Sequence, residues 1–422
     1  MIPTSGLDPK RQTAQRRASP RKRPPPSKVL RIGATNVVST AATPRVAIVG
    51  LGTMGSMTAW QLAKHGIPIT GYERFSSPHD RSSHAGQGRF FRVAYHEGVE
   101  YIPALIRARK LWLELQEEAG QQILRECGFL TIGDLTSPWL TELMKGVAEH
   151  GLRHQILEGT DFTARFPGHK PLADNESGVI DELGGITYPE HAVRSALSLA
   201  RDRGATLHTY TDVVAIEPHG TTVDITTADG TQTFDRVIVT TGAFGPPPGL
   251  TLSRPIRVDR LFHSWFHTNK PADYTFETFL PFMRQSAGLE DYEVGIAGGP
   301  SPDGEIVRAG ATVPYYRGDV DPDALDRTVP LDYVRRMSEV LGEYLPGIDP
   351  NPTRSAVYMD GYTDDLRPVI DTVGETTLVL SGFSGHGFKF SPLVGALAAS
   401  WAISGDAGPL RSAFVTSPDH HE

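Results

Sequence analysis

The segment 45–55, with the sequence RVAIVGLGTMG, restricts the possible folds of this chain more than any other. An apolar strand runs directly into three glycines with the spacing Gly50-x-Gly52-x-x-Gly55. Gly50 permits a tight turn, Gly52 lets a pyrophosphate approach the backbone, and Gly55 allows a helix to pack closely on the strand. The glycine spacing alone is weak evidence, so the segments that follow it decide its meaning.

Those following segments have the order that a dinucleotide-binding unit requires. The residues predict a helix over 56–65, closed by Gly66, and a second short strand over 67–72 that ends at Glu73. An acidic residue at this strand end accepts hydrogen bonds from the adenosine ribose and disfavours a 2′-phosphate. We therefore predict a Rossmann-type α/β domain that binds a dinucleotide other than NADP.

A second glycine-rich segment lies more than 300 residues downstream, at 382–390, with the sequence GFSGHGFKF. It follows a predicted buried strand over 376–380 and precedes an Ala-rich helix with Pro392 in its first turn. Its glycines let the backbone approach a planar ligand, and the helix N-terminus adds partial positive charge. A lysine among aromatic residues is costly without a partner. Alone, the segment could equally be a structural turn with a solvent-reaching lysine.

Bulk properties are those of a globular enzyme rather than a membrane or nucleic-acid-binding protein. The chain has 422 residues, 39% hydrophobic content and a net charge of −8. Its one cysteine, Cys127, excludes an intrachain disulfide and a cysteine-based metal cluster. No apolar run is long enough to span a membrane. We expect a cytoplasmic protein with no nucleic-acid or membrane partner; a monomer fits the sequence, which leaves the oligomeric state open.

The first 44 residues differ from the rest, with nine Lys/Arg against one Asp and a central PRKRPPPSK. This composition cannot build a core, so we expect a disordered basic tail. Arg16 and Arg17 would fit a twin-arginine export signal, but no adequate apolar segment follows them. A nuclear address and a read-through from an upstream start both remain open.

Between the two glycine-rich segments, predicted helices alternate with predicted strands. Helical spacing is evident over 101–122 and 190–204, and strands are predicted between 206 and 244. Residues 257–316 alternate in polarity and indicate a mainly β insertion. His263 and His267 lie on this predicted strand, where their spacing does not suit a metal site, and we predict none.

In order and spacing, four segments resemble the monomeric sarcosine oxidase and N-methyltryptophan oxidase family of FAD enzymes, within the D-amino-acid oxidase superfamily. They are RVAIVGLGTMG, SHAGQGRFFRVAYHEG (83–98), VIVTTGAF and GFSGHGFKF. The resemblance covers about residues 45–412 and implies a discontinuous Rossmann-type FAD-binding domain interleaved with an antiparallel-sheet substrate domain. The implied division is a tail over 1–44, an FAD-binding domain over 45–125, 186–258 and 355–412, a substrate domain over 126–185 and 259–354, and a tail over 413–422.

The resemblance also assigns roles to polar residues. It implies that Arg92 and Lys389 hold a substrate carboxylate, that Arg89 lies near the flavin ring, and that Arg308 stands where the family has a lysine that accelerates reaction with dioxygen. If the resemblance did not hold, Arg89 and Arg92 would instead pair with acids such as Glu97 or Glu100. The implied cofactor-binding residues are Gly50, Gly52, Thr53, Met54, Gly55, Glu73, Arg74, Ser83, His84, Val214, Gly242, Gly385, His386, Gly387, Phe388 and Lys389.

The sequence departs from the family pattern in two places. Ala356 stands where the family has the cysteine that binds FAD covalently. We therefore expect FAD to be held non-covalently. Arg308 keeps the cationic charge but not the ammonium geometry of the family lysine, and Thr312 replaces a family histidine. Rapid reaction with dioxygen is therefore in question.

From these observations we expect an FAD-dependent oxidoreductase that acts on the CH–NH group of a small amine bearing a carboxylate. The resemblance favours an N-methyl or cyclic secondary amino acid, oxidised by hydride transfer to the flavin to give an imine, with dioxygen or another acceptor reoxidising the flavin. One alternative is a dehydrogenase or specialised-metabolism oxidoreductase with a different acceptor. Others are a non-catalytic FAD-binding protein and a plain NAD dehydrogenase.

Overall fold

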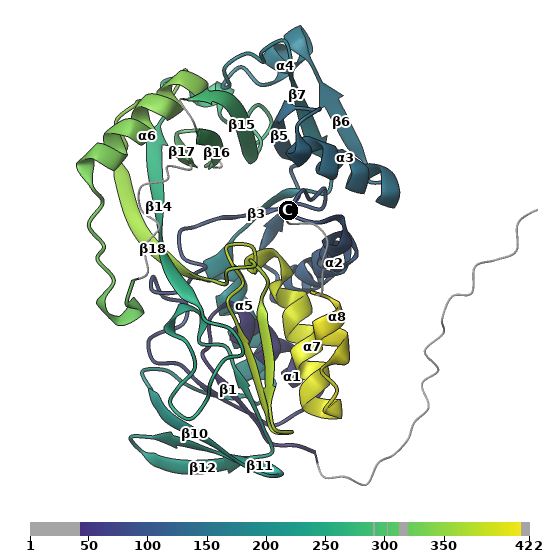
Figure 1. Ribbon diagram of the computed structural model, residues 1–422, viewed down its shortest axis with the longest axis vertical. Coiled ribbons are helices and arrows are strands. Elements are labelled where there is room, and N and C mark those ends of the chain that lie inside the picture. The colour runs from purple at the N-terminus through teal and green to yellow at the C-terminus, as the bar shows by residue number, and fades with distance from the viewer. Residues whose placement is uncertain (1–42, 290–291, 302, 312–319, 415–422) are drawn as a thin grey trace, which may run out of the picture. The chain divides into compact units, whose positions relative to one another are not determined.

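A computed structural model describes residues 43–289, 292–301, 303–311 and 320–414. The predicted basic tail lies outside these residues except for its last two positions, and so does Thr312. The described chain contains two large sheets, each formed by strands that are far apart in the sequence (Figure 1).

The first sheet has six strands in the order β19-β20-β13-β1-β2-β9. All neighbours are parallel except β19 and β20. The strands are β1 (Val46–Val49), β2 (Ile69–Tyr72), β9 (Thr206–His208), β13 (Arg236–Val239), β19 (Val369–Val373) and β20 (Thr377–Ser381). This is the sheet that the glycine motif and the apolar strand before it predict.

Alternate residues of β1 enter two different cores, because side chains of a strand point to opposite faces. Val46 and Ile48 pack with a helical layer of α1 (Thr53–Lys64), α2 (Ile102–Ala119), α5 (Pro189–Asp202) and α7 (Ser391–Ser404). Ala47 and Val49 pack with a small sheet of β10 (Val213–His219), β11 (Thr222–Thr227) and β12 (Gly230–Phe234). Both faces of the central strand are therefore covered, as in other parallel sheets.

The second sheet has eight strands in the order β18-β14-β17-β16-β15-β5-β7-β6. These are β5 (Phe129–Asp134), β6 (His154–Leu157), β7 (Glu176–Asp181), β14 (Arg257–His267), β15 (Phe282–Leu289), β16 (Tyr292–Pro300), β17 (Ile306–Ala311) and β18 (Arg354–Tyr362). The predicted antiparallel pattern holds at every pair except β15 and β5, which run parallel. Apolar residues of α6 (Leu331–Tyr344) pack against this sheet.

Shorter elements complete the described chain. A three-stranded sheet in the order β3-β8-β4 is formed by β3 (Arg89–Phe91), β8 (Gly185–Thr187) and β4 (Leu124–Arg125). The remaining α-helices are α3 (Pro138–His150), α4 (Gly159–Arg165) and α8 (Gly408–Ser412). The α/β class with two interleaved parts is confirmed, and β18 pairs with β14 although the sequence division assigns 355–362 to the FAD-binding part.

Candidate functional site

A cavity of about 690 Å³ opens at the carboxyl edge of the six-stranded sheet. Gly50 follows β1, Glu73 follows β2 and Gly242 follows β13, and all three line it. The cavity continues to His263 on β14 and Arg308 on β17. Ligands of open α/β sheets bind at this edge, so the cavity is the candidate dinucleotide site.

The glycine turn at one end of the cavity has the geometry that its sequence predicts. Gly50 has a φ of +90°, and a Cβ there would lie 2.6 Å from the Thr240 carbonyl oxygen. A Cβ on Gly55 would lie 1.9 Å from the Gly50 carbonyl oxygen, whereas one on Gly52 would meet nothing within 4 Å. The backbone is thus packed tightly beneath the turn and open above it. The turn fits a pyrophosphate, such as that of FAD, lying over Gly52.

Glu73 is placed to accept from a ribose at the same end. Its carboxylate accepts from the backbone N–H of Leu51 at 2.9 Å and of Phe75 at 3.0 Å. Burial acts to raise the pKa of Glu73, but the hydrogen bonds from His79 and the two backbone groups outweigh it and leave the pKa lowered. An ionised carboxylate with free acceptor positions therefore faces the cavity.

Arg89 and His84 also line the cavity. The Arg89 guanidinium donates to the carbonyl oxygens of Ser83, Ala85 and Gly88 at 2.8, 2.6 and 2.8 Å. Burial lowers the pKa of His84 to about 3, with Arg89 contributing, so its imidazole is neutral. Both of its buried ring nitrogens lack a hydrogen-bond partner within the described residues. A bound ligand with polar ring edges would supply such partners.

Arg308 lies beside Arg89 and is held in the same way, by carbonyl oxygens. Its guanidinium donates to Gly86 at 2.9 Å and, more closely, to Gly88. Burial and the neighbouring Arg89 lower the pKa of Arg308 to about 9, which leaves it cationic at neutral pH. Two guanidinium groups therefore give this part of the cavity a positive potential.

Most of the predicted site residues come together here. Those that line the cavity are Gly50, Gly52, Thr53, Met54, Glu73, Arg74, Ser83, His84, Arg89, Val214, Gly242, Arg308, Gly385, Gly387 and Phe388. Gly55, Arg92, His386 and Lys389 do not line it. Gly55 lies beneath the turn because the Gly50 carbonyl occupies the space above it.

Arg92 and Lys389 instead meet in a buried polar cluster next to the cavity, and both are at least 94% buried. The Lys389 ammonium donates to the Tyr95 hydroxyl at 3.2 Å, and the Arg92 guanidinium lies 3.3 Å from a carboxylate oxygen of Glu97. His386 also contacts the Tyr95 hydroxyl, at 3.1 Å. The two cations thus share a site, and the pairing of Arg92 with Glu97 that the sequence left as an alternative is present.

The electrostatics of this cluster bring the pKa of one of its groups, Lys389, close to neutral pH. Burial lowers the pKa of Lys389 to about 7; Glu97 counteracts this shift and Arg92 adds to it. Burial also acts to raise the pKa of Glu97, but Arg92 and Lys389 outweigh it and hold the pKa below its usual range. Lys389 is therefore poised to change charge near neutral pH, while Glu97 stays ionised.

Sequence reasoning missed two carboxylates that position the loops of the site. Asp181, at the end of β7, accepts from the backbone N–H groups of Val93 and Ala94 at 2.6 and 2.9 Å, directly after Arg92. Asp360, on β18, accepts from the backbone N–H of Gly385 at 3.0 Å. Their partners are more than 20 residues away in sequence, so no local pattern marks them.

The placement of possible tethers bears on how a flavin would be attached. Cys127 lies between β4 and β5 and lines neither the cavity described above nor a second one beside it. Ala356 lines neither of them, whereas Tyr358, two residues along β18, lines the second cavity. Among the described residues, no thiol therefore lines the candidate dinucleotide cavity.

Comparison with known proteins identifies the family. Residues 45–401 match the FAD dependent oxidoreductase family. The chain belongs to this family. Its match covers both glycine-rich segments and both large sheets, and the family is one of FAD-dependent enzymes.

The similarity to individual FAD-dependent oxidoreductases extends over most of the chain. Monomeric sarcosine oxidase of Bacillus sp. (strain NS-129) is 32% identical over 89% of this chain and 96% of its own length. N-methyl-L-tryptophan oxidase of Yersinia pestis (strain Pestoides F) is 28% identical over 84% of this chain and 94% of its own. The resemblance drawn from the motifs is confirmed.

Solved structures support the fold. NikD, an unusual amino acid oxidase essential for nikkomycin biosynthesis, superimposes in its open form with a TM-score of 0.77 at 23% identity, covering 90% of this chain and 99% of NikD. L-proline dehydrogenase from P. horikoshii gives a TM-score of 0.72 at 19% identity, covering 87% of this chain and 95% of the dehydrogenase.

The described residues also bear on other classes of site. No helix there is both long enough and apolar enough to cross a membrane. No three His, Cys, Asp or Glu side chains there are grouped so that they could hold a metal ion.

Proposed function

We propose that this FAD-dependent oxidoreductase oxidises a small amine that carries a carboxylate, with a secondary amino acid as the preferred class. The observation that carries the proposal is the pair of buried cations, Arg92 and Lys389, beside a cavity that fits FAD. Two desolvated cations next to each other are costly unless an anion joins them. The relatives named for sarcosine and N-methyltryptophan support the same substrate class.

The cations would act by binding and orientation. The planar Arg92 guanidinium suits bidentate contact with a carboxylate, and the Lys389 ammonium adds a second charge. In the structure Arg92 is paired with Glu97. A substrate carboxylate would therefore replace Glu97 as the partner of Arg92. Glu97 is about one-third exposed and can turn toward solvent when replaced. Holding the substrate in one orientation supplies much of the rate in such sites.

The cavity residues would hold FAD non-covalently, with the pyrophosphate over Gly52, a ribose on Glu73 and the flavin near His84, Arg89 and Arg308. Bound there, FAD accepts the two electrons that the amine loses when it becomes an imine. Arg89 and Arg308 provide positive charge beside the flavin, and neutral His84 can donate or accept a hydrogen bond. No protein nucleophile is required.

A panel experiment tests the proposal. The purified protein is mixed anaerobically with N-methyl, cyclic and primary amino acids and with the matching amines that lack a carboxylate, while flavin absorbance is followed. Bleaching by secondary amino acids but not by the decarboxylated amines supports it. A protein without a flavin spectrum, or one bleached equally by both sets, contradicts it. Acid denaturation should release FAD into the supernatant, which tests non-covalent attachment.

The electron acceptor is a separate part of the proposal. Arg308 presents a guanidinium, fixed by two carbonyl oxygens, where the family lysine is expected. It has less freedom than an ammonium to form new hydrogen bonds, which favours an acceptor other than dioxygen. Slow reoxidation in air after anaerobic reduction would support this alternative, and rapid reoxidation would exclude it.

A further inference from the structure

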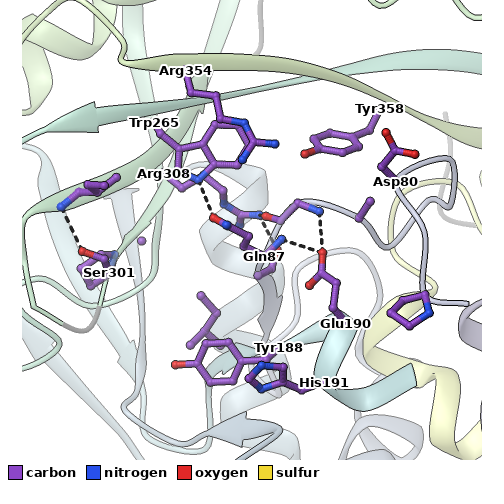
Figure 2. A pocket seen from close by; sticks show the side chains of 18 of the residues that line it. Asp80, Gln87, Tyr188, Glu190, His191, Trp265, Ser301, Arg308, Arg354 and Tyr358 are labelled. Atoms are coloured by element: carbon purple, nitrogen blue, oxygen red, sulfur yellow. Dashed lines mark hydrogen bonds between the residues drawn. The ribbon is translucent and has the colours of Figure 1, made fainter. Parts of the chain in front are cut away.

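A second cavity, of about 730 Å³, lies beside the FAD cavity and has no role in the scheme above (Figure 2). The loop over 82–90 separates the two. Ser83 and His84 from this loop line the FAD cavity, whereas Gly86 and Gln87 line the second one. Arg308 lines both cavities, so a ligand in the second would lie next to a group that also faces the flavin.

The separating loop is fixed by three sets of hydrogen bonds. The Glu190 carboxylate accepts from the backbone N–H of Gly86 at 3.0 Å and of Gln87 at 3.1 Å. The Arg308 guanidinium donates to the Gly86 carbonyl at 2.9 Å. The Trp265 indole N–H donates to the Gln87 side-chain oxygen at 3.1 Å. The second cavity is therefore preformed, as sites for small molecules commonly are.

The walls of this cavity combine aromatic surface with positive charge. The Arg354 guanidinium lies over the Trp265 ring, 4.5 Å from its centroid. Figure 2 shows Tyr358 beside this pair and Tyr188 across the cavity from it. Trp265 and Tyr358 are at least 94% buried, while Arg354 is exposed at the rim. Flat aromatic faces favour a planar ligand, and a cation at the rim favours an anionic substituent.

The cation at the rim of this cavity is not paired with an acid of the described chain. Asp80 pairs with Arg327 at 2.9 Å, and Glu190 holds the loop amides. In the part of the chain that the structure describes, no carboxylate lies within 4.0 Å of the Arg354 guanidinium. The Arg354 guanidinium instead stacks on Trp265. Arg354 is therefore the cation that the rim of this cavity offers to an anionic ligand.

We propose that this second cavity binds a planar aromatic anion that serves as the electron acceptor, a quinone-type ring with an acidic substituent. The proposal rests on the proposed function, because it supplies the oxidant for the amine. In the overall reaction the amine loses two electrons and two protons to become an imine, and the quinone gains two electrons and two protons to become a hydroquinone. The ring lies between Trp265, Tyr358 and Tyr188, with its anionic group at Arg354.

The placement favours an acceptor over the amine substrate. The amine carboxylate has its own cations, Arg92 and Lys389, which line neither cavity. The loop over 82–90 keeps a ligand in the second cavity from touching the flavin directly, but electrons can cross a single loop. Dioxygen would need neither the aromatic walls nor the rim cation.

Binding is tested first, without turnover. A naphthalene sulfonate, planar and redox-inert, is titrated calorimetrically into the FAD-loaded protein, its Arg354→Glu variant and an Arg335→Glu control. Arg335 is an exposed residue of α6 outside both cavities. We expect about tenfold or greater loss of affinity in Arg354→Glu and less than about twofold change in the control. Equal affinities in all three proteins would overturn the proposal.

Electron transfer is tested next. Each protein is reduced anaerobically with dithionite and mixed with a naphthoquinone sulfonate or with dioxygen, and flavin absorbance is followed. Arg354→Glu should slow reoxidation by the quinone about tenfold and leave reoxidation by dioxygen unchanged. If the variant instead slows reduction by an amine, the cavity belongs to the substrate and the acceptor proposal is wrong. Dithionite needs no amine, so failure of the amine panel would refute only the proposed function.

Discussion

Two pairs of cations flank the flavin cavity, and they are compensated in different ways. Arg92 and Lys389 share a buried cluster with the carboxylate of Glu97, 3.3 Å from Arg92. Arg89 and Arg308 are held by loop carbonyl oxygens, and no carboxylate among the described residues lies within ion-pair distance of either. Both pairs are partly or fully removed from water.

The difference separates two uses of positive charge. A carboxylate partner cancels a full charge, so the Arg92 pair becomes available only when another carboxylate takes the place of Glu97. Carbonyl dipoles satisfy the N–H groups of a guanidinium but leave its net charge in place. The pair Arg92 and Lys389 is therefore suited to exchanging one anion for another. The pair Arg89 and Arg308 is suited to maintaining a constant positive electrostatic potential at the proposed flavin position.

The largest expected effect comes from breaking the exchangeable pair. Arg92→Met removes the bidentate partner of the substrate carboxylate and leaves Glu97 beside Lys389 alone. We expect KM for an amino-acid substrate to rise on the order of a hundredfold, because truncating one partner of a buried charge pair costs about 2–5 kcal/mol. Steady-state kinetics measure it, with flavin absorbance as the check that FAD is still bound. An unchanged KM would show that Arg92 does not bind the substrate carboxylate.

The second effect is a pH dependence at Lys389. Its pKa of about 7 means that the free enzyme carries the ammonium below this pH and the neutral amine above it. A bound carboxylate favours the ammonium, so affinity should be constant at low pH and fall as the pH rises through about 7, by up to about tenfold per pH unit. Titration with acetate, followed by the flavin spectrum, measures it. The midpoint also reports on the neighbours Arg92, Glu97 and His386, and Lys389→Met should abolish the dependence.

The third prediction addresses the constant potential. Arg308→Met removes one of the two guanidinium charges at the flavin end, so reduced flavin is less stabilised and the midpoint potential should become more negative by several tens of millivolts. Arg308→Lys keeps the charge and should recover much of the loss. Equilibrium titration against reference dyes gives the potential, with Arg335→Met as the matched control. An unchanged midpoint potential would show that the charge of Arg308 does not affect the flavin.

The smallest effect is expected from Glu97→Gln. The amide no longer competes with a substrate carboxylate, so acetate should bind a few times more tightly at a pH below the midpoints of both proteins. Because Glu97 raises the pKa of Lys389, its loss should also move the midpoint of the pH dependence downward. The same spectral titration measures both quantities. Weaker binding at a pH below the midpoints of both proteins would mean that Glu97 positions Arg92 rather than competing for it.

The two glycine-rich turns and the α/β class could be predicted from the sequence, because they depend on local rules for strands, turns and glycine. Most other residues that line the cavity were expected only because the sequence resembles a family of FAD enzymes. It could not settle Arg92, whose two candidate partners, a substrate carboxylate and Glu97, are both compatible with the motif. The roles of Asp181 and Asp360 could not be predicted. Each lies on a strand and accepts hydrogen bonds from backbone N–H groups of a loop that is distant in the sequence. The second cavity was missed because it combines residues of the loop over 82–90, β14, β17 and β18.

The distribution of the flavin cavity along the chain has a consequence for biosynthesis. Its lining runs from Val49 to Phe388. The strand β1 acquires its neighbour β13 only after residue 239, and β13 acquires its own outer neighbour β20 only after residue 381. A growing chain therefore displays the glycine turn long before the opposite wall exists. If FAD binds in this cavity, as proposed, premature termination before residue 388 should yield chains that capture no flavin.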